Sequence, residues 1–447
     1  MQVDASIFKA YDIRGVYPGQ LDEQVAYAVG RAFVTFLQVD QLIVGRDMRL
    51  SSPPVREALV HGLTDQGADV TDIGMVSTDQ YYHACAILER AGLMVTASHN
   101  PPQYCGFKMV RRMPYLLSGD EGIQDLRRIV EEDAYAPLPS RRGEVTFRDT
   151  SEGFVDRILG LVDPAQIRPL RVIADTGNGM VGPILQRVFQ RLPVHLTGLY
   201  LEPDGRLPNH GLDPLQPENR AELERRVVAE KADVGFAFDG DGDRFFAIDD
   251  RGRFVAGDFL TALMGEYLLE RYPGGTVIHD VRASWAVPDL IRASGGVPLV
   301  ERVGHAFIKP RMIREGAVFG GEVTGHYYFR DFYNADSGLV PALFLLEMLS
   351  RRGVRLSELL DPLQAKYFIS GEINSRIADP QGRMEALARR YADARLDRLD
   401  GISVTYADWH FNVRPSNTEP LLRLNLEATS RRLMEEKRDE VVGVIRG

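Results

Sequence analysis

Three aspartates stand at every second position of one short segment, DGDGDR. Asp239, Asp241 and Asp243 alternate with two glycines there. This spacing places three hard oxygen ligands within reach of one cation, and without a cation the carboxylates would repel one another. Oxygen ligands favour Mg²⁺ or Ca²⁺ over Zn²⁺. An EF-hand does not fit, because Arg244 occupies its glycine position and the flanking VGFAF and FFAI are strand-like. The segment predicts a divalent-cation site, with a solvated acidic turn as the alternative.

A second polar segment, TASHNP, follows the apolar residues GLMV. Ser98 lies just past that expected strand, where its hydroxyl would be exposed. The same residues could simply cap a helix or form a turn. Adjacency of Ser98 and His99 does not make a base-activated nucleophile, because neighbouring side chains diverge on an extended backbone. The sequence contains no G-x-S-x-G, which weakens an α/β-hydrolase interpretation.

Two further polar segments have residue types suited to sugars and phosphates. In GGEVTGH, Glu322 and Thr324 would share one side of an extended segment and could bind sugar hydroxyls; a glycine-rich turn is the alternative. In RPSNTEP, Arg414 offers a planar fork for phosphate, and Ser416, Asn417 and Thr418 supply further donors. A hairpin turn rarely needs this combination, so anion binding is the favoured interpretation.

The expected elements place these segments at strand ends. Short apolar segments, separated by helical stretches, are typical of buried parallel strands in βα units, and ligands bind at the carboxyl ends of such strands. They come in three groups of three, which predicts three related α/β domains. The segments begin at Gln41, Asp69 and Ala91; at Arg171, Pro193 and Ala232; and at Thr276, Val297 and Glu315.

From about Pro362 onward, strands and two charged helical stretches indicate a smaller α+β domain. We therefore predict an α/β fold of three related domains with mixed, mainly parallel sheets, plus a C-terminal α+β domain, around a central cleft. The expected domains are 1–145 with the serine loop, 146–247 with the metal loop, 248–361 with the sugar-binding loop, and 362–447 with the phosphate-binding loop.

The composition is that of a folded enzyme. The chain has 447 residues and a net charge of −10, which gives no general attraction to nucleic acid or anionic membrane. Its two cysteines, Cys85 and Cys105, cannot form a disulfide framework. We find no signal peptide and no apolar run long enough to span a membrane, so the expected compartment is the cytoplasm.

One motif favours a different class of protein. Gly177, Gly179 and Gly182 satisfy G-x-G-x-x-G between a strand and a helix, and Glu202 follows at the distance of a ribose-binding acid. A dinucleotide-binding oxidoreductase is therefore an alternative, although it leaves the metal and phosphate segments unexplained. A tight strand-to-helix turn is the simpler interpretation.

The segments TASHNP, DGDGDR, GEVTGH and RPSNTEP, in this order after an opening FKAYDIRG, resemble the α-D-phosphohexomutase family and its phosphomannomutase/phosphoglucomutase group. The resemblance runs over nearly the whole chain. It implies an isomerase that interconverts hexose 6-phosphate and hexose 1-phosphate, of mannose or glucose or both, through a phosphoserine enzyme and a 1,6-bisphosphate intermediate. It also implies one Mg²⁺ per subunit, a hexose 1,6-bisphosphate activator, sugar-phosphate partners without nucleic acid or membrane, and a monomer or dimer.

The resemblance also assigns roles to individual residues. Ser98 would be the phosphoserine and would share the metal with the three aspartates, and Lys108 and His326 would be the better candidates for general acid and base. The other expected catalytic residues are His99, Arg14 and Arg244. The expected substrate-binding residues are Tyr11, Arg282, His305, Glu322, Thr324, Arg414, Ser416, Asn417 and Thr418.

Two positions depart from the family's common pattern. Many relatives have serine where this chain has Thr324, and the extra methyl group could bias the choice of sugar. Phosphoglucosamine mutases typically have glycine at the position of Asn417, so an amino-sugar substrate is the less favoured alternative.

Overall fold

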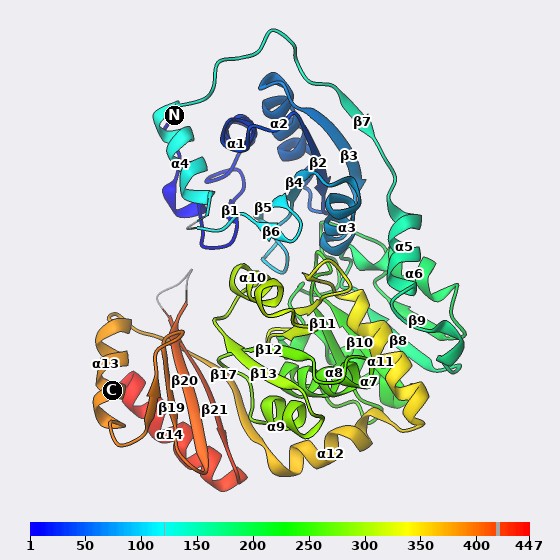
Figure 1. The fold of residues 1–447 in the computed structure, drawn as a ribbon, viewed down its shortest axis with the longest axis vertical. Coiled ribbons are helices and arrows are strands. Elements are labelled where there is room, and N and C mark those ends of the chain that lie inside the picture. The colour runs from blue at the N-terminus through cyan, green and yellow to red at the C-terminus, as the bar shows by residue number, and fades with distance from the viewer. Residues whose placement is uncertain (120, 417–420) are drawn as a thin grey trace. The chain divides into compact units, whose positions relative to one another are not determined.

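The computed structural model describes residues 1–119, 121–416 and 421–447. By its internal contacts the chain divides into two compact units, residues 1–254 with 326–353, and residues 255–325 with 354–447. Each unit is described by itself, with the element labels of Figure 1.

The first unit begins with a mixed sheet in the order β1-β5-β4-β2-β3-β7. Strand β2 runs parallel to β3 and β4, whereas β5 is antiparallel to β1 and β4. Every residue of β4 is buried, as expected for a central strand of apolar sequence. The strands are β1 (Ile13–Val16), β2 (Gln41–Arg46), β3 (Asp69–Met75), β4 (Ala91–Val95), β5 (Tyr104–Arg112), β6 (Tyr115–Leu116, paired with β5) and β7 (Val145–Phe147).

Helices α1 and α2 pack tightly on one another beside this sheet. Asp22 caps α1 by accepting a hydrogen bond from the backbone N–H of Val25. The two helices approach so closely that a Cβ atom at Gly62 would lie 2.1 Å from the carbonyl oxygen of Tyr27. The helices are α1 (Glu23–Leu37), α2 (Ser52–Asp65), α3 (Thr78–Leu88) and α4 (Ile123–Glu132), and a 3₁₀ turn (Ala5–Ile7) precedes them.

The second sheet of this unit has the order β11-β10-β8-β9. Strand β8 is parallel to β9 and β10, and β10 turns back antiparallel into β11. The elements are α5 (Ser151–Leu159), β8 (Arg171–Asp175), α6 (Val181–Phe189), β9 (His195–Leu199), α7 (Ala221–Ala229), β10 (Val234–Phe238) and β11 (Phe245–Ile248), with 3₁₀ turns at Pro164–Gln166 and Pro217–Asn219. The unit also holds β15 (Tyr327–Phe329), β16 (Ala335–Asp336) and α11 (Leu339–Arg352).

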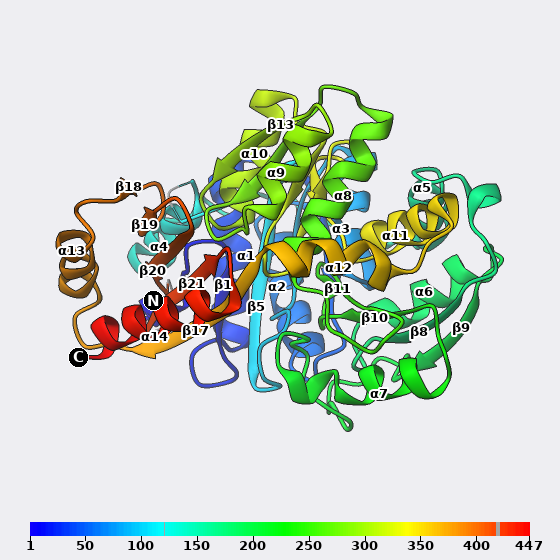
Figure 2. The ribbon, with the colours of Figure 1, turned by 90° about the horizontal axis from the view of Figure 1, so that it is seen from below.

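In the second unit, β12 lies between β13 and β14 and is parallel to both. A separate antiparallel sheet follows in the order β17-β21-β20-β19-β18, with α13 and α14 packed on it (Figure 2). The first group is α8 (Gly257–Arg271), β12 (Thr276–Asp280), α9 (Ala286–Ala293), β13 (Val297–Glu301), α10 (His305–Glu315), β14 (Phe319–Gly321) and α12 (Leu356–Lys366). The second is β17 (Phe368–Arg376), α13 (Pro380–Arg390), β18 (Arg395–Asp397), β19 (Ile402–Thr405), β20 (Trp409–Pro415), β21 (Leu421–Ala428) and α14 (Arg431–Arg446).

The fold class is thereby confirmed, with mixed, mainly parallel sheets up to β14 and an antiparallel α+β region after α12. The predicted strands starting at Gln41, Ala91 and Arg171 form at those residues. Within the described ranges, every helix is too short or too polar to cross a membrane. The domain boundaries given above remain a prediction.

Candidate active site

The three aspartates lie in the turn between β10 and β11, and all are buried. The turn closes because Oδ1 of Asp239 accepts hydrogen bonds from the backbone N–H groups of Gly242 and Arg244. Gly242 has φ of 79°, a left-handed conformation that favours glycine. The ligand oxygens of Asp239, Asp241 and Asp243 all lie within 4.8 Å of one another. The sequence spacing therefore does bring three carboxylates to one point.

The pKa values of Asp239 and Asp241 are shifted in opposite directions. Burial, with the charges of Asp243 and Asp241 close by, raises the pKa of Asp239 well above its ordinary value. Burial and the charge of Asp243 would also raise the pKa of Asp241. Its contacts with Lys108 and with the hydroxyl of Thr78 outweigh these effects, so the pKa of Asp241 is lowered. Asp239 thus resists ionisation in this cluster, whereas Asp241 is held as a carboxylate.

Lys108, on β5, supplies the cation that faces the cluster. Its ammonium donates hydrogen bonds to Oδ2 of Asp241 at 2.8 Å and to Oδ2 of Asp243. Burial would lower the pKa of this ammonium, but the carboxylates of Asp241, Asp243, Asp336 and Asp239 outweigh burial and raise it. Lys108 is therefore charged at neutral pH.

These aspartates have the properties of a divalent-cation site. Oδ1 of Asp241 is buried and has no hydrogen-bond partner among the described residues. The ammonium of Lys108 already lies where positive charge is needed, against the other carboxylate oxygens of the cluster. Hard, buried, mutually close oxygens match the ligand preferences of Mg²⁺. Asp239, Asp241 and Asp243 could therefore hold a metal ion.

Ser98 faces this cluster from the loop after β4. Its Oγ donates a hydrogen bond to Oδ2 of Asp239 at 2.7 Å, and its side chain is almost completely buried. Its Oγ also lies 3.1 Å from Nδ1 of His99. The expectation that these neighbouring side chains diverge is wrong, because Ser98 has a left-handed backbone with φ of 47° rather than an extended one.

Two other predicted residues, His99 and Arg14, belong to the serine loop or contact it. Burial lowers the pKa of His99 well below its ordinary value, with the positive charges of Arg244 and Arg14 acting in the same direction, so the imidazole is neutral at physiological pH. Arg14 forms an ion pair with Asp12 and donates a hydrogen bond to Oδ1 of Asn100 in the serine loop. Tyr11 is half-buried in the turn before β1.

Arg244 and His326 lie beside one another and close to the aspartates. Their backbones form an isolated antiparallel bridge. Nε of Arg244 lies 3.9 Å from Oδ2 of Asp239, and Nε2 of His326 lies 3.6 Å from Oδ1 of Asp243. The first unit thus brings together Ser98, His99, Lys108, Arg244, His326 and the three aspartates.

Residues that the sequence analysis did not select support Asp241. The hydroxyls of Thr78 and Thr96 both donate hydrogen bonds to its Oδ2, at 2.7 and 3.1 Å. The backbone N–H of Thr78 donates to the Asp241 carbonyl oxygen. Thr96 stands at a strand end and could have been noticed. Thr78 begins helix α3 and carries no sequence signal of its contact with a residue 163 positions away.

The second unit contains the predicted sugar loop. Glu322 is buried and its Oε2 accepts a hydrogen bond from the backbone N–H of Gly304, next to His305 at the start of α10. Thr324 follows in a turn closed by the Gly325 N–H and the Glu322 carbonyl oxygen. The segment is therefore a turn, and the extended geometry that would place Glu322 and Thr324 on one side is wrong.

Arg282 and Arg414 are both buried in this unit, and the charge of Arg282 acts on Arg414. The guanidinium of Arg282 is ion-paired with Asp280 at 2.8 Å and lies 3.7 Å from Oε2 of Glu322. Burial lowers the pKa of Arg414, and the charges of Arg282 and Arg423 act in the same direction. The hydroxyl of Ser416 accepts a hydrogen bond from Arg423 at 3.4 Å. A buried arginine among other arginines suits an anion. The predicted residues Asn417 and Thr418 lie outside the described part of the chain.

The glycine motif forms a tight turn in which the backbone itself needs glycine. A Cβ atom at Gly182 would lie 1.8 Å from the carbonyl oxygen of Leu201, and one at Gly179 would lie 2.7 Å from the carbonyl oxygen of Gly240. These close approaches to the metal loop and to the segment after β9 explain the glycines without a dinucleotide.

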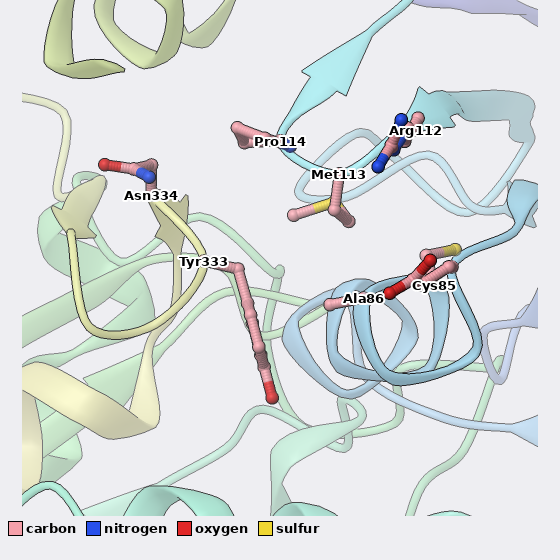
Figure 3. A pocket seen from close by; sticks show the side chains of 8 residues that line it. Cys85, Ala86, Arg112, Met113, Pro114, Tyr333 and Asn334 are labelled. Carbon is pink, nitrogen blue, oxygen red and sulfur yellow. The ribbon is translucent and has the colours of Figure 1, made fainter.

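A cavity of about 220 Å³ is lined by residues outside the predicted site. Figure 3 shows the side chains that line it. It opens between the end of α3, the β5–β6 turn and the segment before β16, and none of the predicted site residues lines it. The hydroxyl of Tyr333 on its wall lies 3.1 Å from Nδ1 of His83. Its lining is Cys85, Ala86, Glu89, Arg112, Met113, Pro114, Tyr333 and Asn334.

Serine, buried aspartates and arginines on this fold define a phosphoryl-transfer class of enzyme, and comparison with known proteins agrees. Four family descriptions match the chain: phosphoglucomutase/phosphomannomutase alpha/beta/alpha domain I over residues 5–136, domain II over 152–252, domain III over 256–367 and the C-terminal domain over 372–444. The chain belongs to the phosphoglucomutase/phosphomannomutase family.

Individual relatives cover nearly the whole chain. A phosphomannomutase of Escherichia coli (strain K12) is 41% identical over 430 residues, which are 94% of each chain. A protein of Xanthomonas campestris named phosphohexose mutases is 40% identical over 98% of this chain and 99% of its own. A crystal structure of a phosphoglucomutase/phosphomannomutase family protein from Burkholderia thailandensis superposes with a TM-score of 0.91 at 36% identity, covering 99% and 98%. The predicted family is confirmed.

Proposed function

We propose that this protein is an intramolecular phosphotransferase that interconverts hexose 6-phosphate and hexose 1-phosphate, with mannose, glucose or both as the sugar. The observation that carries the proposal is the 2.7 Å contact between Oγ of Ser98 and Asp239 in a buried aspartate cluster. The relatives named phosphomannomutase and phosphohexose mutases support the same activity.

In the proposed reaction, Ser98 carries a phosphoryl group. The bond between phosphorus and Oγ breaks as a bond forms to a free hydroxyl oxygen of the sugar phosphate, and that hydroxyl proton passes to a base. The product is a hexose 1,6-bisphosphate, and transfer of its other phosphoryl group back to Ser98 releases the isomer. The first transfer takes a phosphoryl group from Ser98, and the second returns one while the base gives its proton back to the leaving sugar oxygen. A full cycle therefore consumes no outside phosphoryl donor.

The residues around Ser98 suit the steps assigned to them. Lys108 and Arg244 bring positive charge to the serine and aspartates, where charge on the moving phosphoryl group must be offset. His326 is the proposed base, and its Nε2 lies 3.6 Å from Oδ1 of Asp243. We further propose that Asp239, Asp241 and Asp243 bind one Mg²⁺ per subunit; such an ion supplies charge neutralisation to phosphoryl transfer.

The second unit has the residues proposed to hold the sugar phosphate. Glu322 and Thr324 would bind ring hydroxyls of the sugar. Arg282, which lies 3.7 Å from Glu322, and His305, next to the Gly304 N–H that Glu322 binds, would also contact the substrate. Arg414 and Ser416 would bind the phosphate that does not react, together with Asn417 and Thr418. Tyr11, in the first unit, is proposed as a further substrate-binding residue. The four predicted domains, 1–145, 146–247, 248–361 and 362–447, would each contribute one of the four loops.

The experiment is an isomerisation assay of mannose 1-phosphate, glucose 1-phosphate and glucosamine 1-phosphate, each with Mg²⁺ and a trace of the matching 1,6-bisphosphate. Turnover of either of the first two supports the proposal, and their ratio gives the sugar preference. Turnover of glucosamine 1-phosphate alone would keep the chemistry but assign an amino sugar. Ser98→Ala should abolish turnover and labelling by a radioactive bisphosphate; retention of both would refute the role of Ser98.

A further inference from the structure

A single buried arginine ties together the carbonyl groups of the serine loop. Nη2 of Arg49 donates hydrogen bonds to the carbonyl oxygens of Ser98 (2.8 Å) and Asn100 (2.6 Å), and Nη1 donates to those of Pro101 (2.7 Å) and Tyr104 (3.2 Å). Arg49 is only 2% exposed. Three carbonyls of the serine loop and that of Tyr104, the first residue of β5, thus converge on one guanidinium.

Asp47 holds Arg49 in place and contacts the loop itself. Its Oδ2 lies 3.2 Å from Nε of Arg49, and its Oδ1 accepts hydrogen bonds from the backbone N–H of Arg49 and the hydroxyl of Ser52. The backbone N–H of Ala97 also donates to Oδ2 of Asp47, at 3.4 Å. Both charges are buried, and they compensate one another.

The conformation that this pair holds is one that serine seldom adopts. Ser98 has φ of 47°, which is uncommon for a residue with a side chain and persists only where the surroundings enforce it. With its carbonyl oxygen bound to Arg49, the Ser98 side chain is directed to Asp239. A different backbone conformation would move Oγ away from the carboxylate.

We infer that Arg49 is a positioning residue for phosphoryl transfer, which fixes the serine loop so that Oγ of Ser98 keeps its place beside the aspartates whether or not it carries a phosphoryl group. A phosphoryl group next to three carboxylates brings electrostatic repulsion that would push a loose loop away. A guanidinium with five donors in a rigid plane can hold four carbonyls, whereas a lysine ammonium has three donors at one point. This inference rests on the proposed function.

The first test compares Arg49→Lys with the matched control Arg220→Lys. Arg220 also donates to two loop carbonyls, those of Pro214 and Leu215, but that loop contains none of the predicted site residues. We expect R49K to lower kcat about 100-fold or more, as misplacement of a reacting group by about 1 Å does, while KM for the sugar phosphate changes less than about threefold. R220K should leave both constants near those of the wild-type enzyme.

The second test needs no turnover, and its first measurement uses the wild-type enzyme. Amide hydrogen exchange of residues 97–100 in the wild-type enzyme, without metal or sugar phosphate, should be as slow as exchange in strand β4, and R49K should speed it about tenfold or more. Fast amide exchange of this loop in the wild-type enzyme would overturn the inference. If R49K does not fold, the exchange rate of the wild-type loop is the deciding measurement. An active wild type with equal kinetics in R49K and R220K would also overturn it. A wild-type enzyme without mutase activity would instead refute the proposed function. The exchange rates would then still test whether Arg49 fixes the conformation of the serine loop.

Discussion

Replacement of Lys108 by methionine should separate two roles of its ammonium, in folding and in metal binding. Methionine keeps much of the side-chain volume but removes the charge that contacts Asp241 and Asp243. In the metal-free protein, K108M leaves a group of buried carboxylates without their cation. Those carboxylates then repel one another at the distances found here.

The size of the effect follows from the geometry. Two unit charges about 4 Å apart interact by about 4 kcal/mol at an effective dielectric constant of about 20. Removal of one partner of a buried pair generally costs about 3–5 kcal/mol. We therefore expect metal-free K108M to lose about 3–5 kcal/mol of unfolding free energy at pH 8. The loss should shrink at lower pH, because protonation of Asp239, whose pKa is already raised, relieves the repulsion.

Magnesium should reverse much of this loss. In the wild-type protein, the ammonium of Lys108 competes with a divalent cation for oxygens of Asp241 and Asp243. In K108M this positively charged competitor is absent. K108M should bind Mg²⁺ at least about tenfold more tightly, and saturating Mg²⁺ should raise its stability more than that of the wild type. Its turnover should nevertheless fall by a factor of about 10² to 10⁴, because a group that assists proton transfer and charge stabilisation is gone.

The assay is urea unfolding in EDTA and in a series of MgCl₂ concentrations, together with calorimetric titration of Mg²⁺. Lys309→Met is a matched control, because Lys309 is also buried but lies in the second unit. K309M should lose stability equally with and without Mg²⁺. Equal Mg²⁺ affinity in K108M and the wild type, or a metal-free K108M as stable as the wild type, would refute the electrostatic reasoning.

Three further substitutions test other contacts. Thr78→Val removes one hydroxyl donor from Asp241, so Mg²⁺ affinity by calorimetry should fall about tenfold, and an unchanged affinity would contradict the contact. Burial lowers the pKa of the His83 imidazole to about 4, whereas the ordinary pKa of histidine, which the unfolded chain keeps, is about 6.5. Between pH 7.5 and 4.5 the unfolded state therefore takes up a proton that the folded state does not, and wild-type stability should fall by about 2–3 kcal/mol. His83→Gln should flatten that dependence in urea unfolding. Glu322→Gln should raise KM for the sugar phosphate at least about tenfold without blocking labelling of Ser98 by a bisphosphate, and an unchanged KM would exclude Glu322 from sugar binding.

The parts of the site that could be predicted from sequence are those whose geometry is local. Alternating aspartates and glycines in DGDGDR are enough to gather three carboxylates, and the apolar strand before them predicts the strand end on which they lie. The family resemblance added the roles of the loops. The strands at Gln41, Ala91 and Arg171 were predictable because buried parallel strands have continuous apolar sequences.

The parts that could not be predicted depend on contacts between distant residues. Arg49 lies in GRDMR at the end of β2, a position where a charged residue could have been noticed, but the four carbonyls that it binds are 49 to 55 residues away. The contact of Ser98 with His99 was missed because it needs a left-handed backbone, which a sequence reveals for glycine and seldom for serine. Glu322 and Thr324 were expected on an extended segment, but the segment forms a turn in which the Gly325 N–H donates to the Glu322 carbonyl oxygen.

Two buried groups with perturbed pKa values link these observations to the proposed chemistry. Burial and neighbouring carboxylates raise the pKa of Asp239, while burial and neighbouring guanidinium groups lower that of Arg414. In each case a charged group is buried with charges of its own sign close by, and the opposite charges near it do not offset these effects on its pKa. A cation would relieve the first and an anion the second. An enzyme that binds a divalent cation at its reacting serine and a phosphate at the far end of its substrate needs both kinds of imbalance, and a stable fold without ligands would have no reason to keep either.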